Sequence, residues 1–264
     1  MATAVLHAFP CRSSTVSAGR TRAVTHENAS VANCQTCSMR DLCLPAGLDA
    51  ADRAQLDRIV VHRKRGLKRG EYLFRAGAAL QSLFAVQAGF LKTCVLHDDG
   101  REQVAGFHMM GDLLGFDAIG SESHMCDAVA LEDTEICEIP FDALEKLSHR
   151  LPSLQHHFHR LMSREITRDH GVMLLLGSMR AEERLAAFLL NLSQRFAARG
   201  YSSTSFVLRM TREEIGSFLG LKLETVSRAL SAFQSEGWIA VQNKNIEIKS
   251  PQQLRAVLGA RAPR

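Results

Sequence analysis

Residues 211–237 read TREEIGSFLGLKLETVSRALSAFQSEG. Thr211 and Glu214 have the spacing of a capping box, in which each side chain accepts a hydrogen bond from the other residue's backbone at the start of a helix. Gly220 follows this short helix, and glycine readily adopts the positive φ that a tight turn requires. A second helix is expected over residues 223–236, because a glycine follows it. Two helices joined by a glycine turn predict a helix-turn-helix.

The second of these helices has an apolar face and a polar face. The apolar positions follow helical spacing and predict a buried stripe: Val226, Leu230 and Phe233. The polar face carries Glu224, Ser227 and Arg228 in the first two turns. Helix-turn-helix proteins read bases from this part of the second helix, where Arg recognises guanine and Glu accepts a hydrogen bond from cytosine. The alternative is that Glu224 and Arg228 pair with each other across one turn.

A hairpin is expected after the second helix, around Asn243-Lys244, and it would form the wing of a winged helix. Residues 205–249 hold six basic and five acidic residues, so their net charge is unremarkable. Phosphate contacts are expected from Arg209, Arg212 and Lys244, supplemented by helix N-termini. Two helices, a glycine turn and a wing together predict DNA binding.

The charge of the whole chain is divided unevenly. The net charge is +4, but residues 34–159 hold 13 basic and 18 acidic residues, whereas residues 160–264 hold 16 basic and nine acidic residues. An acidic front and a basic back indicate two domains, of which the C-terminal one binds a polyanion. The composition is 46% hydrophobic and 23% charged, which is typical of globular proteins. No apolar run is long enough for a membrane helix, and the seven cysteines favour a reduced, cytoplasmic protein.

The middle of the chain predicts a small antiparallel β-barrel or jelly roll. Nine of the 18 glycines lie between residues 66 and 120, where they separate short runs of strand-forming residues. Asp98-Asp99-Gly100 is a hairpin signal between two of these runs. Before this region, a helix is expected over residues 48–63, capped by Asp49 or Asp52.

A long helix is expected over residues 153–179, followed by a second helix over residues 180–199. Alternating steps of four and three residues predict the seam of a coiled-coil dimer: Phe158, Met162, Glu165, Asp169, Val172, Leu176 and Met179. Two carboxylates lie in the middle of that seam. The alternative is a helix packed on its own domain, with Ile166 and Met173 shifting the true stripe.

Three cysteines form a compact motif before the first predicted helix. Cys34, Cys37 and Cys43 have the spacing Cys-x2-Cys-x5-Cys, and such a turn binds soft metal ions well. A fourth ligand has to come from the remaining cysteines: Cys11, Cys94, Cys126 or Cys137. A closed zinc site, an iron–sulfur cluster and a dithiol switch all fit this pattern.

These motifs, in this order, resemble the fumarate and nitrate reduction regulator branch of the cyclic-AMP receptor protein superfamily. The resemblance covers about residues 33–248 and is carried by CQTCSMRDLCLP, GFHMMGDLLGFDAIGS, CEIPF, AEERLAAFLLNLSQRFAARG and MTREEIGSFLGLKLETVSR. It implies an α+β protein with a cyclic-nucleotide-binding-like β-barrel or jelly roll, a long dimerisation helix and a winged helix-turn-helix. The expected divisions are a disordered tail (1–33), a cluster-binding and sensor domain (34–150), the dimerisation helix (151–180) and the DNA-binding domain (181–264).

The resemblance also implies a homodimer with one oxygen-labile [4Fe-4S] cluster per subunit. It assigns the fourth ligand to Cys137, in the family's Cys-Glu-Ile-Pro-Phe stretch, and leaves Cys11, Cys94 and Cys126 as bystanders. Glu224, Ser227 and Arg228 match the family's reading motif, which implies an inverted-repeat promoter site resembling TTGAT and ATCAA separated by four base pairs. Asp169 matches an acidic residue that the family keeps on its dimer helix. The cluster-loaded dimer is expected to bind DNA in oxygen-poor cells and to recruit or block RNA polymerase.

One departure from the wider superfamily argues against a cyclic nucleotide. Nucleotide-binding relatives hold the phosphate with an Arg-Ser pair after a glycine-rich turn, but residues 115–129 read GFDAIGSESHMCDAV and contain no Arg. A buried phosphodiester without a cation would be costly, so no cyclic nucleotide is expected.

Other functional classes are less well supported by the sequence. It contains no glycine-rich phosphate loop, nucleophile elbow or catalytic carboxylate pair, so we expect no enzyme. A regulator of the same fold that is stapled by zinc or switched by thiol oxidation is the alternative to the cluster-based sensor.

Overall fold

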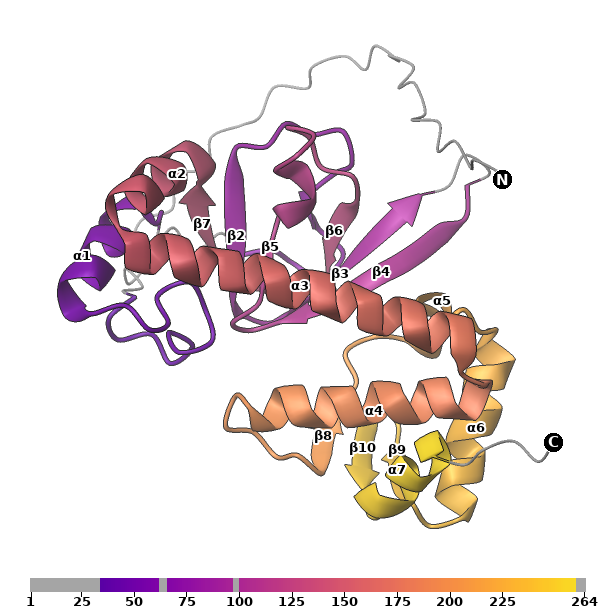
Figure 1. Ribbon diagram of the computed structural model, residues 1–264. Helices are drawn as coiled ribbons and strands as arrows, with labels where there is room; N and C mark the ends of the chain where they lie inside the picture. The colour runs from indigo at the N-terminus through magenta and orange to yellow at the C-terminus, as the bar shows by residue number, and fades with distance from the viewer. Residues whose placement is uncertain (1–33, 62–65, 97–99, 260–264) are drawn as a thin grey trace, which may run out of the picture. The chain divides into compact units, whose positions relative to one another are not determined.

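The strands of the middle region form two antiparallel sheets, as the computed structural model shows (Figure 1). The structure describes residues 34–61, 66–96 and 100–259. One sheet has the order β1-β6-β3-β4, and the other has the order β5-β2-β7. Their bounds are β1 Tyr72–Phe74, β2 Ser82–Ala88, β3 Phe90–Leu96, β4 Glu102–Met109, β5 Leu113–Leu114, β6 Asp127–Ala130 and β7 Glu135–Pro140, with a short 3-10 helix at Phe116–Ala118.

This arrangement confirms the predicted fold class in its two-sheet form rather than as a closed barrel. Strands β3 and β4 pair antiparallel from Phe90 with Met109 to Leu96 with Glu102, as expected of a hairpin. Asp98 and Asp99, at the predicted turn of that hairpin, lie outside the described residues, as does the predicted tail at residues 1–33.

The predicted first helix is α1, Ala50–Ile59, and it is shorter than the sequence suggested. Asp49 caps its start, because its side chain accepts a hydrogen bond of 2.8 Å from the backbone of Asp52. A further helix that we did not predict, α2 Phe141–Arg150, follows β7 directly. It buries Leu144 and Leu147 against the strands and helices before it.

The long helix is α3, Pro152–Ser178, and α4 follows at Ala181–Ala197. Helix α3 passes along the β-sheets and continues toward the C-terminal helices (Figure 1). Large apolar side chains on α3 are nevertheless exposed, with Ile166 56% and Met173 62% accessible. The described part of the chain therefore leaves part of this helix uncovered.

The C-terminal region contains the predicted helix-turn-helix and wing. Its elements are β8 Ser205–Val207, α5 Arg212–Leu219, α6 Leu223–Ser235, β9 Ile239–Gln242, β10 Asn245–Ile248 and α7 Pro251–Gly259. The capping box is confirmed: the Thr211 hydroxyl accepts from the Glu214 backbone at 3.1 Å, and the Glu214 carboxylate accepts from the Thr211 backbone at 2.7 Å. Gly220 has a φ of +62°, as the turn between α5 and α6 requires.

Three apolar clusters form the core. The first joins α4, α6, α7 and the wing, and it extends to β4 through Phe107. The second joins the segment before α1 to β2, β7 and α2, and the third fills the space between the two sheets. Within residues 34–61, 66–96 and 100–259, no helix is both long and apolar enough to cross a membrane.

Candidate functional site

Residues 34–48, which we call the cysteine loop, fold into successive turns before α1. The backbone N–H of Arg40 donates to the carbonyl of Cys37 at 3.2 Å, and that of Cys43 donates to the carbonyl of Met39 at 3.0 Å. The backbone N–H of Cys34 donates to the carboxylate of Asp57 on α1 at 2.8 Å. These bonds fix the three predicted cysteines on a folded loop that is anchored to α1.

Cys137 lies beside this loop, although it is far away in the sequence. It lies on β7, where it pairs with Ala85 on β2. One cavity of about 40 Å³ is lined by all four predicted ligands, Cys34, Cys37, Cys43 and Cys137, together with apolar side chains that include Leu44, Leu56, Val60 and Ile139. The structure therefore brings these four cysteines together.

Two other cysteines lie elsewhere. Cys94 is buried in β3. The thiol of Cys126 lies 3.5 Å from a carboxylate oxygen of Asp117 and lines a different cavity. Cys11 lies outside the described residues. Spacing alone could not choose among these candidates for the fourth ligand, whereas the folded chain places only Cys137 against the loop among those it describes.

The surroundings of Cys34, Cys43 and Cys137 disfavour free thiolates. Burial raises the pKa of Cys43 to about 12 and the pKa of Cys137 to about 11. Burial and the neighbouring carboxylate of Asp57 also raise the pKa of Cys34 well above its usual range. Three of the thiols therefore carry protons at neutral pH unless a bound cation stabilises the thiolates.

Four cysteines can hold either a single tetrahedral ion or an iron–sulfur cluster. Among the described residues, no three His, Cys, Asp or Glu side chains converge closely enough to hold one metal ion. A [4Fe-4S] cluster binds its four thiolates through different iron atoms, so its ligands surround a larger group than one tetrahedral ion does. Four cysteines around one apolar cavity are compatible with such a group.

The predicted base-reading residues lie on the surface of the helix-turn-helix. Glu224 and Arg228 are exposed on the first turns of α6, and Ser227 is half-buried between them. Ion pairs one turn apart join Glu165 to Arg168 and Arg180 to Glu183, but none in the described part of the chain joins Glu224 to Arg228. The two side chains are therefore available to a ligand instead of pairing with each other.

Contacts to a phosphate backbone are possible from both sides of α6. Arg212 at the start of α5 donates to the hydroxyl of Ser227 at 3.3 Å and is exposed. Lys244 is exposed at the tip of the wing, between β9 and β10. No side chain forms a capping hydrogen bond at Lys222, the N-cap of α6, so the first backbone N–H groups of this described helix can face an anion.

Some of the predicted seam residues of α3 contact their own chain. The ring of Phe158 lies 5.9 Å from that of Phe116. The carboxylate of Glu165 accepts from Arg168 at 3.1 Å. The other members that are half-buried in the same way are Met162, Val172, Leu176 and Met179.

The exposed side of α3 follows a slightly different stripe. Asp169 is exposed there, between Ile166 and Met173, and Leu174 is 62% accessible beside them. The alternative interpretation placed Ile166 and Met173 on a stripe packed against the chain's own domain, and this was wrong, because both side chains are exposed. The uncovered surface nevertheless keeps one of the two predicted carboxylates at its centre.

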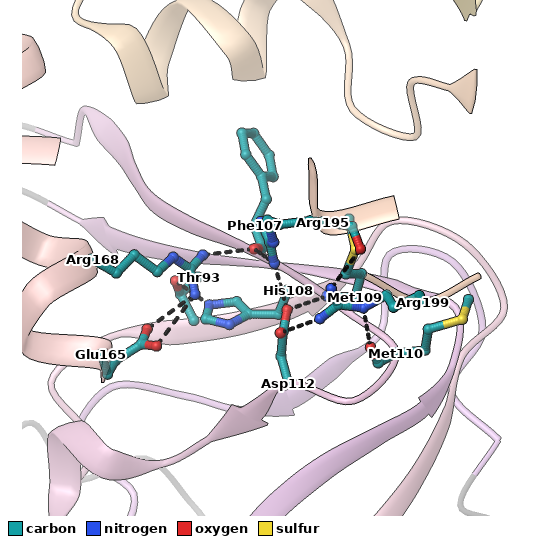
Figure 2. A network of polar contacts seen from close by, with 10 residues as sticks. All are labelled: Thr93, Phe107, His108, Met109, Met110, Asp112, Glu165, Arg168, Arg195 and Arg199. Atoms are coloured by element: carbon teal, nitrogen blue, oxygen red, sulfur yellow. Dashed lines mark hydrogen bonds and ion pairs between the residues drawn. The ribbon is translucent and has the colours of Figure 1, made fainter. Parts of the chain in front are cut away.

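The sequence did not predict a polar network between the turn after β4 and helix α4. Figure 2 shows Asp112 pointing at Arg195 and Arg199, with His108 and Arg168 close by. Two features of the sequence belong to this network. Arg195 and Arg199 are one helical turn apart, and Asp112 is the one acidic residue in GFHMMGDLLG. Neither feature indicates its partner without the fold.

Comparison with known proteins agrees with this architecture. The model of the cyclic nucleotide-binding domain matches residues 64–150, and the model of the Crp-like helix-turn-helix domain matches residues 183–257. The fumarate and nitrate reduction regulatory protein of Salmonella typhimurium strain LT2 is 48% identical over 227 residues, which are 86% of this chain and 90% of that protein. The transcriptional activator protein Anr of Pseudomonas protegens is 49% identical, over 86% of this chain and 93% of that protein.

A solved structure shows the same fold. FixK2 from Bradyrhizobium japonicum is 30% identical, with a TM-score of 0.70 over 75% of this chain and 98% of that one. The fumarate and nitrate reduction regulatory protein and Anr are transcription regulators rather than enzymes, and the Crp-like helix-turn-helix is a DNA-binding module. On this evidence, the chain belongs to the family of the fumarate and nitrate reduction regulatory proteins and Anr, which are transcription regulators with a Crp-like helix-turn-helix.

Proposed function

We propose that this regulator senses oxygen through one [4Fe-4S] cluster per subunit, held by Cys34, Cys37, Cys43 and Cys137. The observation that carries the proposal is the meeting of these four cysteines around one apolar cavity. When bound, the cluster supplies a redox-labile group that oxygen destroys. Ser38 is exposed on the cysteine loop, so the loop has a side open to solvent and to dissolved oxygen.

The state of the cysteine loop is proposed to control dimerisation through α3. With all four thiolates engaged, the loop is tied to β7 through Cys137. The loop also contacts α3 directly, because His157 donates to the carbonyl of Cys43 at 3.2 Å. At the start of α3, Ser153 donates to Asp52 on α1 at 2.6 Å. A rearrangement of the loop therefore reaches the first turns of α3.

The exposed stripe of α3 is the proposed dimer contact. Ile166, Met173 and Leu174 offer apolar surface that the described chain leaves uncovered. In a symmetric dimer, the two copies of Asp169 would face each other, and their repulsion opposes pairing by on the order of 1 kcal/mol. Apolar contact and like-charge repulsion thus oppose each other, so a modest change in α3 is sufficient to shift the monomer–dimer equilibrium.

The dimer is proposed to bind an inverted-repeat promoter site. Two copies of α6 would enter successive major grooves, with Glu224, Ser227 and Arg228 facing base edges. Arg212 and Lys244 would contact the flanking phosphates. Bound in this way, the protein would recruit or block RNA polymerase in oxygen-poor cells and so regulate anaerobic metabolism.

A cyclic nucleotide is not part of the proposal. A cavity of about 370 Å³ lies between the sheets and α3, and Arg168 is the cation among its lining residues. Its guanidinium is already bound to Glu165 and to the carbonyl of Phe107, at 3.1 and 2.8 Å. Two further carboxylates, Asp117 and Asp169, line the same cavity. These groups disfavour a phosphodiester.

The test is anaerobic purification, followed by an absorbance spectrum and by analysis of iron, acid-labile sulfide and zinc. A brown chromophore with iron and sulfide that bleaches in air supports the proposal. One zinc per chain would support a zinc-stapled regulator on the same fold. Neither metal, with air-dependent thiol oxidation, would support a thiol switch.

A matched pair of variants tests the ligand set. Cys137→Ser should abolish the chromophore, because Cys137 lines the cavity beside the cysteine loop. Cys126→Ser should leave it unchanged, because Cys126 lines a separate cavity. The reverse result would reassign the fourth ligand.

A further inference from the structure

The turn at residues 109–112 lies between the cysteine loop and helix α4. It closes through a backbone hydrogen bond of 3.0 Å from Asp112 to Met109, and the Asp112 carboxylate accepts from the backbone of Met109 at 2.8 Å. Two more backbone bonds join it to β2: Gly111 donates to Val86 at 2.8 Å, and Val86 donates to Asp112 at 3.0 Å. The turn is therefore a fixed part of the β-sheet domain.

One side of this turn touches the cysteine loop. Gly111 has a φ of +86°, and a Cβ atom at this position would lie 3.1 Å from the Cβ of Leu42 and 3.8 Å from that of Met39. The loop and the turn are thus packed so closely that a Cβ atom at position 111 would force Leu42 to shift by a few tenths of an ångström. Leu42 directly precedes Cys43, so a shift of the proposed ligands moves a residue in contact with the turn.

The other side of the turn holds α4. The carboxylate of Asp112 accepts from Arg195 at 2.5 Å and from Arg199 at 2.6 Å (Figure 2). Arg199 also donates to the carbonyl of Met110 at 2.5 Å. The side chains are largely enclosed, with Arg199 7% and Asp112 19% exposed. Charge-assisted hydrogen bonds of this kind are stronger and more directional than neutral ones.

Helix α4 in turn belongs to the helix-turn-helix domain. Leu185, Leu189 and Leu192 of α4 lie in the same buried cluster as Val226 and Leu230 of α6. A shift of α4 relative to the turn therefore also moves α6, the helix that carries Glu224 and Arg228. The path from Leu42 through Gly111, Asp112 and the two arginines does not use the exposed stripe of α3.

We propose that Asp112 is a positioning residue that couples the cysteine loop directly to the helix-turn-helix domain through Arg195 and Arg199. Through Asp112, a change in the cysteine loop alters the placement of the reading helices. This effect is additional to the dimerisation controlled by α3. The inference rests on the proposed function, because gain or loss of the cluster is what changes the loop.

A double-mutant cycle tests the coupling. Asp112→Asn, Arg199→Gln and the double variant are purified anaerobically, and their iron content, dimerisation and affinity for a duplex with TTGAT and ATCAA half-sites are measured. Asp112→Asn should keep the chromophore and the dimer but bind DNA about tenfold or more weakly, within the usual range of coupling between sites. Arg199→Gln should behave alike, and the double variant should be no worse than either single one.

The matched control removes an ion pair inside the β-sheet domain. Lys68 and Asp133 lie 2.7 Å apart, and neither lies in the turn, the cysteine loop or the helix-turn-helix. Asp133→Asn should leave DNA affinity within about twofold of the wild type, as expected of an exposed pair. Equal losses in Asp133→Asn and Asp112→Asn, or additive losses in the double variant, would overturn the inference.

Hydrogen exchange separates positioning from a general loss of stability. In the wild type, exposure to air should raise amide exchange in α4. In Asp112→Asn, exchange in α4 should already be high without air, and air should add nothing further. A variant that remains air-responsive in α4 contradicts the inference. If Asp112→Asn does not fold, Asp112→Glu, which retains the charge but displaces it, replaces it in the same measurements.

The two proposals fail in different ways. A wild type without an iron chromophore contradicts the proposed function, yet the cycle of Asp112 and Arg199 on DNA affinity still decides whether the turn positions the reading helices. A wild type with the chromophore and an Asp112→Asn variant of unchanged DNA affinity contradicts this inference alone.

Discussion

The Nε2 atom of His157 lies 3.2 Å from the carbonyl oxygen of Cys43, so the last cysteine of the loop is hydrogen-bonded to the first turns of α3. His157 is 5% exposed, and its neighbour His156 is exposed on the same helix. The imidazole of His157 is therefore held against the loop, whereas that of His156 faces solvent.

His157→Phe should weaken dimerisation while leaving cluster loading intact. The lost hydrogen bond contributes about 1 kcal/mol, so the dimer dissociation constant should rise about fivefold. Sedimentation equilibrium under anaerobic conditions, at matched iron content, measures this change. His157→Gln retains a donor and should lie closer to the wild type, and His156→Ala should have no effect. If the dimer dissociation constant of His157→Phe is unchanged, the hydrogen bond between His157 and Cys43 does not contribute to dimerisation.

Asp169→Ala should allow dimers without a cluster. Asp169 is exposed in the middle of the uncovered stripe of α3, so its replacement removes like-charge repulsion and adds apolar surface. Sizing the aerobic variant by light scattering checks the result. Glu165→Gln is the matched control, because the carboxylate of Glu165 already binds Arg168 of its own chain. A monomeric aerobic Asp169→Ala would contradict the charge-poised dimer.

Local signals in the sequence were sufficient for the helix-turn-helix but not for contacts between distant segments. The capping box of Thr211 and Glu214 and the turn at Gly220 depend on neighbouring residues, and both formed as predicted. Helix α2 was missed because its short amphipathic pattern follows β7 without a side-chain cap. Helix α7 was missed although Ser250 and Pro251 offer a helix-start signal. The turn at Asp112 and its two arginines could not be paired from sequence, because only the packing of α4 on β4 makes them neighbours.

The seam of α3 illustrates the same limit in another way. A long helix with apolar residues on two sides offers two stripes, and periodicity cannot tell which one packs on its own chain. Phe158 meets Phe116 of its own chain, whereas Met173 is left exposed. Only the positions of the β-sheets decide between the two stripes.

Arg228→Ala and Lys244→Ala should affect DNA binding in different ways. Arg228 is exposed on the reading face of α6, so its loss should cost about 1–3 kcal/mol and relax specificity at one base pair of each half-site. Lys244 at the wing tip should contribute through phosphates, so its loss should weaken all duplexes alike and lower the salt dependence by about one charge. Fluorescence anisotropy with specific and mutated duplexes at several salt concentrations distinguishes these patterns. If the two variants lose specificity equally, α6 does not read the bases through Arg228.

Acidification should destabilise the protein through His108. Its Nε2 atom lies 3.1 Å from the hydroxyl of Thr93, and its Nδ1 atom is buried without a hydrogen-bond partner among the described residues. Burial, together with the positive charge of Arg168, lowers the pKa of His108 from 6.5 to about 3. Between these pH values, the unfolded chain binds a proton at this residue that the folded chain does not bind. The free energy of unfolding should therefore fall as the pH drops below about 6.5, by up to about 1.4 kcal/mol per pH unit from this residue.

The contribution of His108 is isolated by comparison of variants. Urea unfolding at pH 7 and pH 5 should show a smaller loss of stability for His108→Gln than for the wild type, because glutamine keeps a polar contact to Thr93 without a titrating group. His149→Gln, a replacement of an exposed histidine on α2, should lose as much stability as the wild type does. If His108→Gln shows the full pH dependence, the acid sensitivity originates in other groups, and the buried imidazole beside Arg168 serves packing alone.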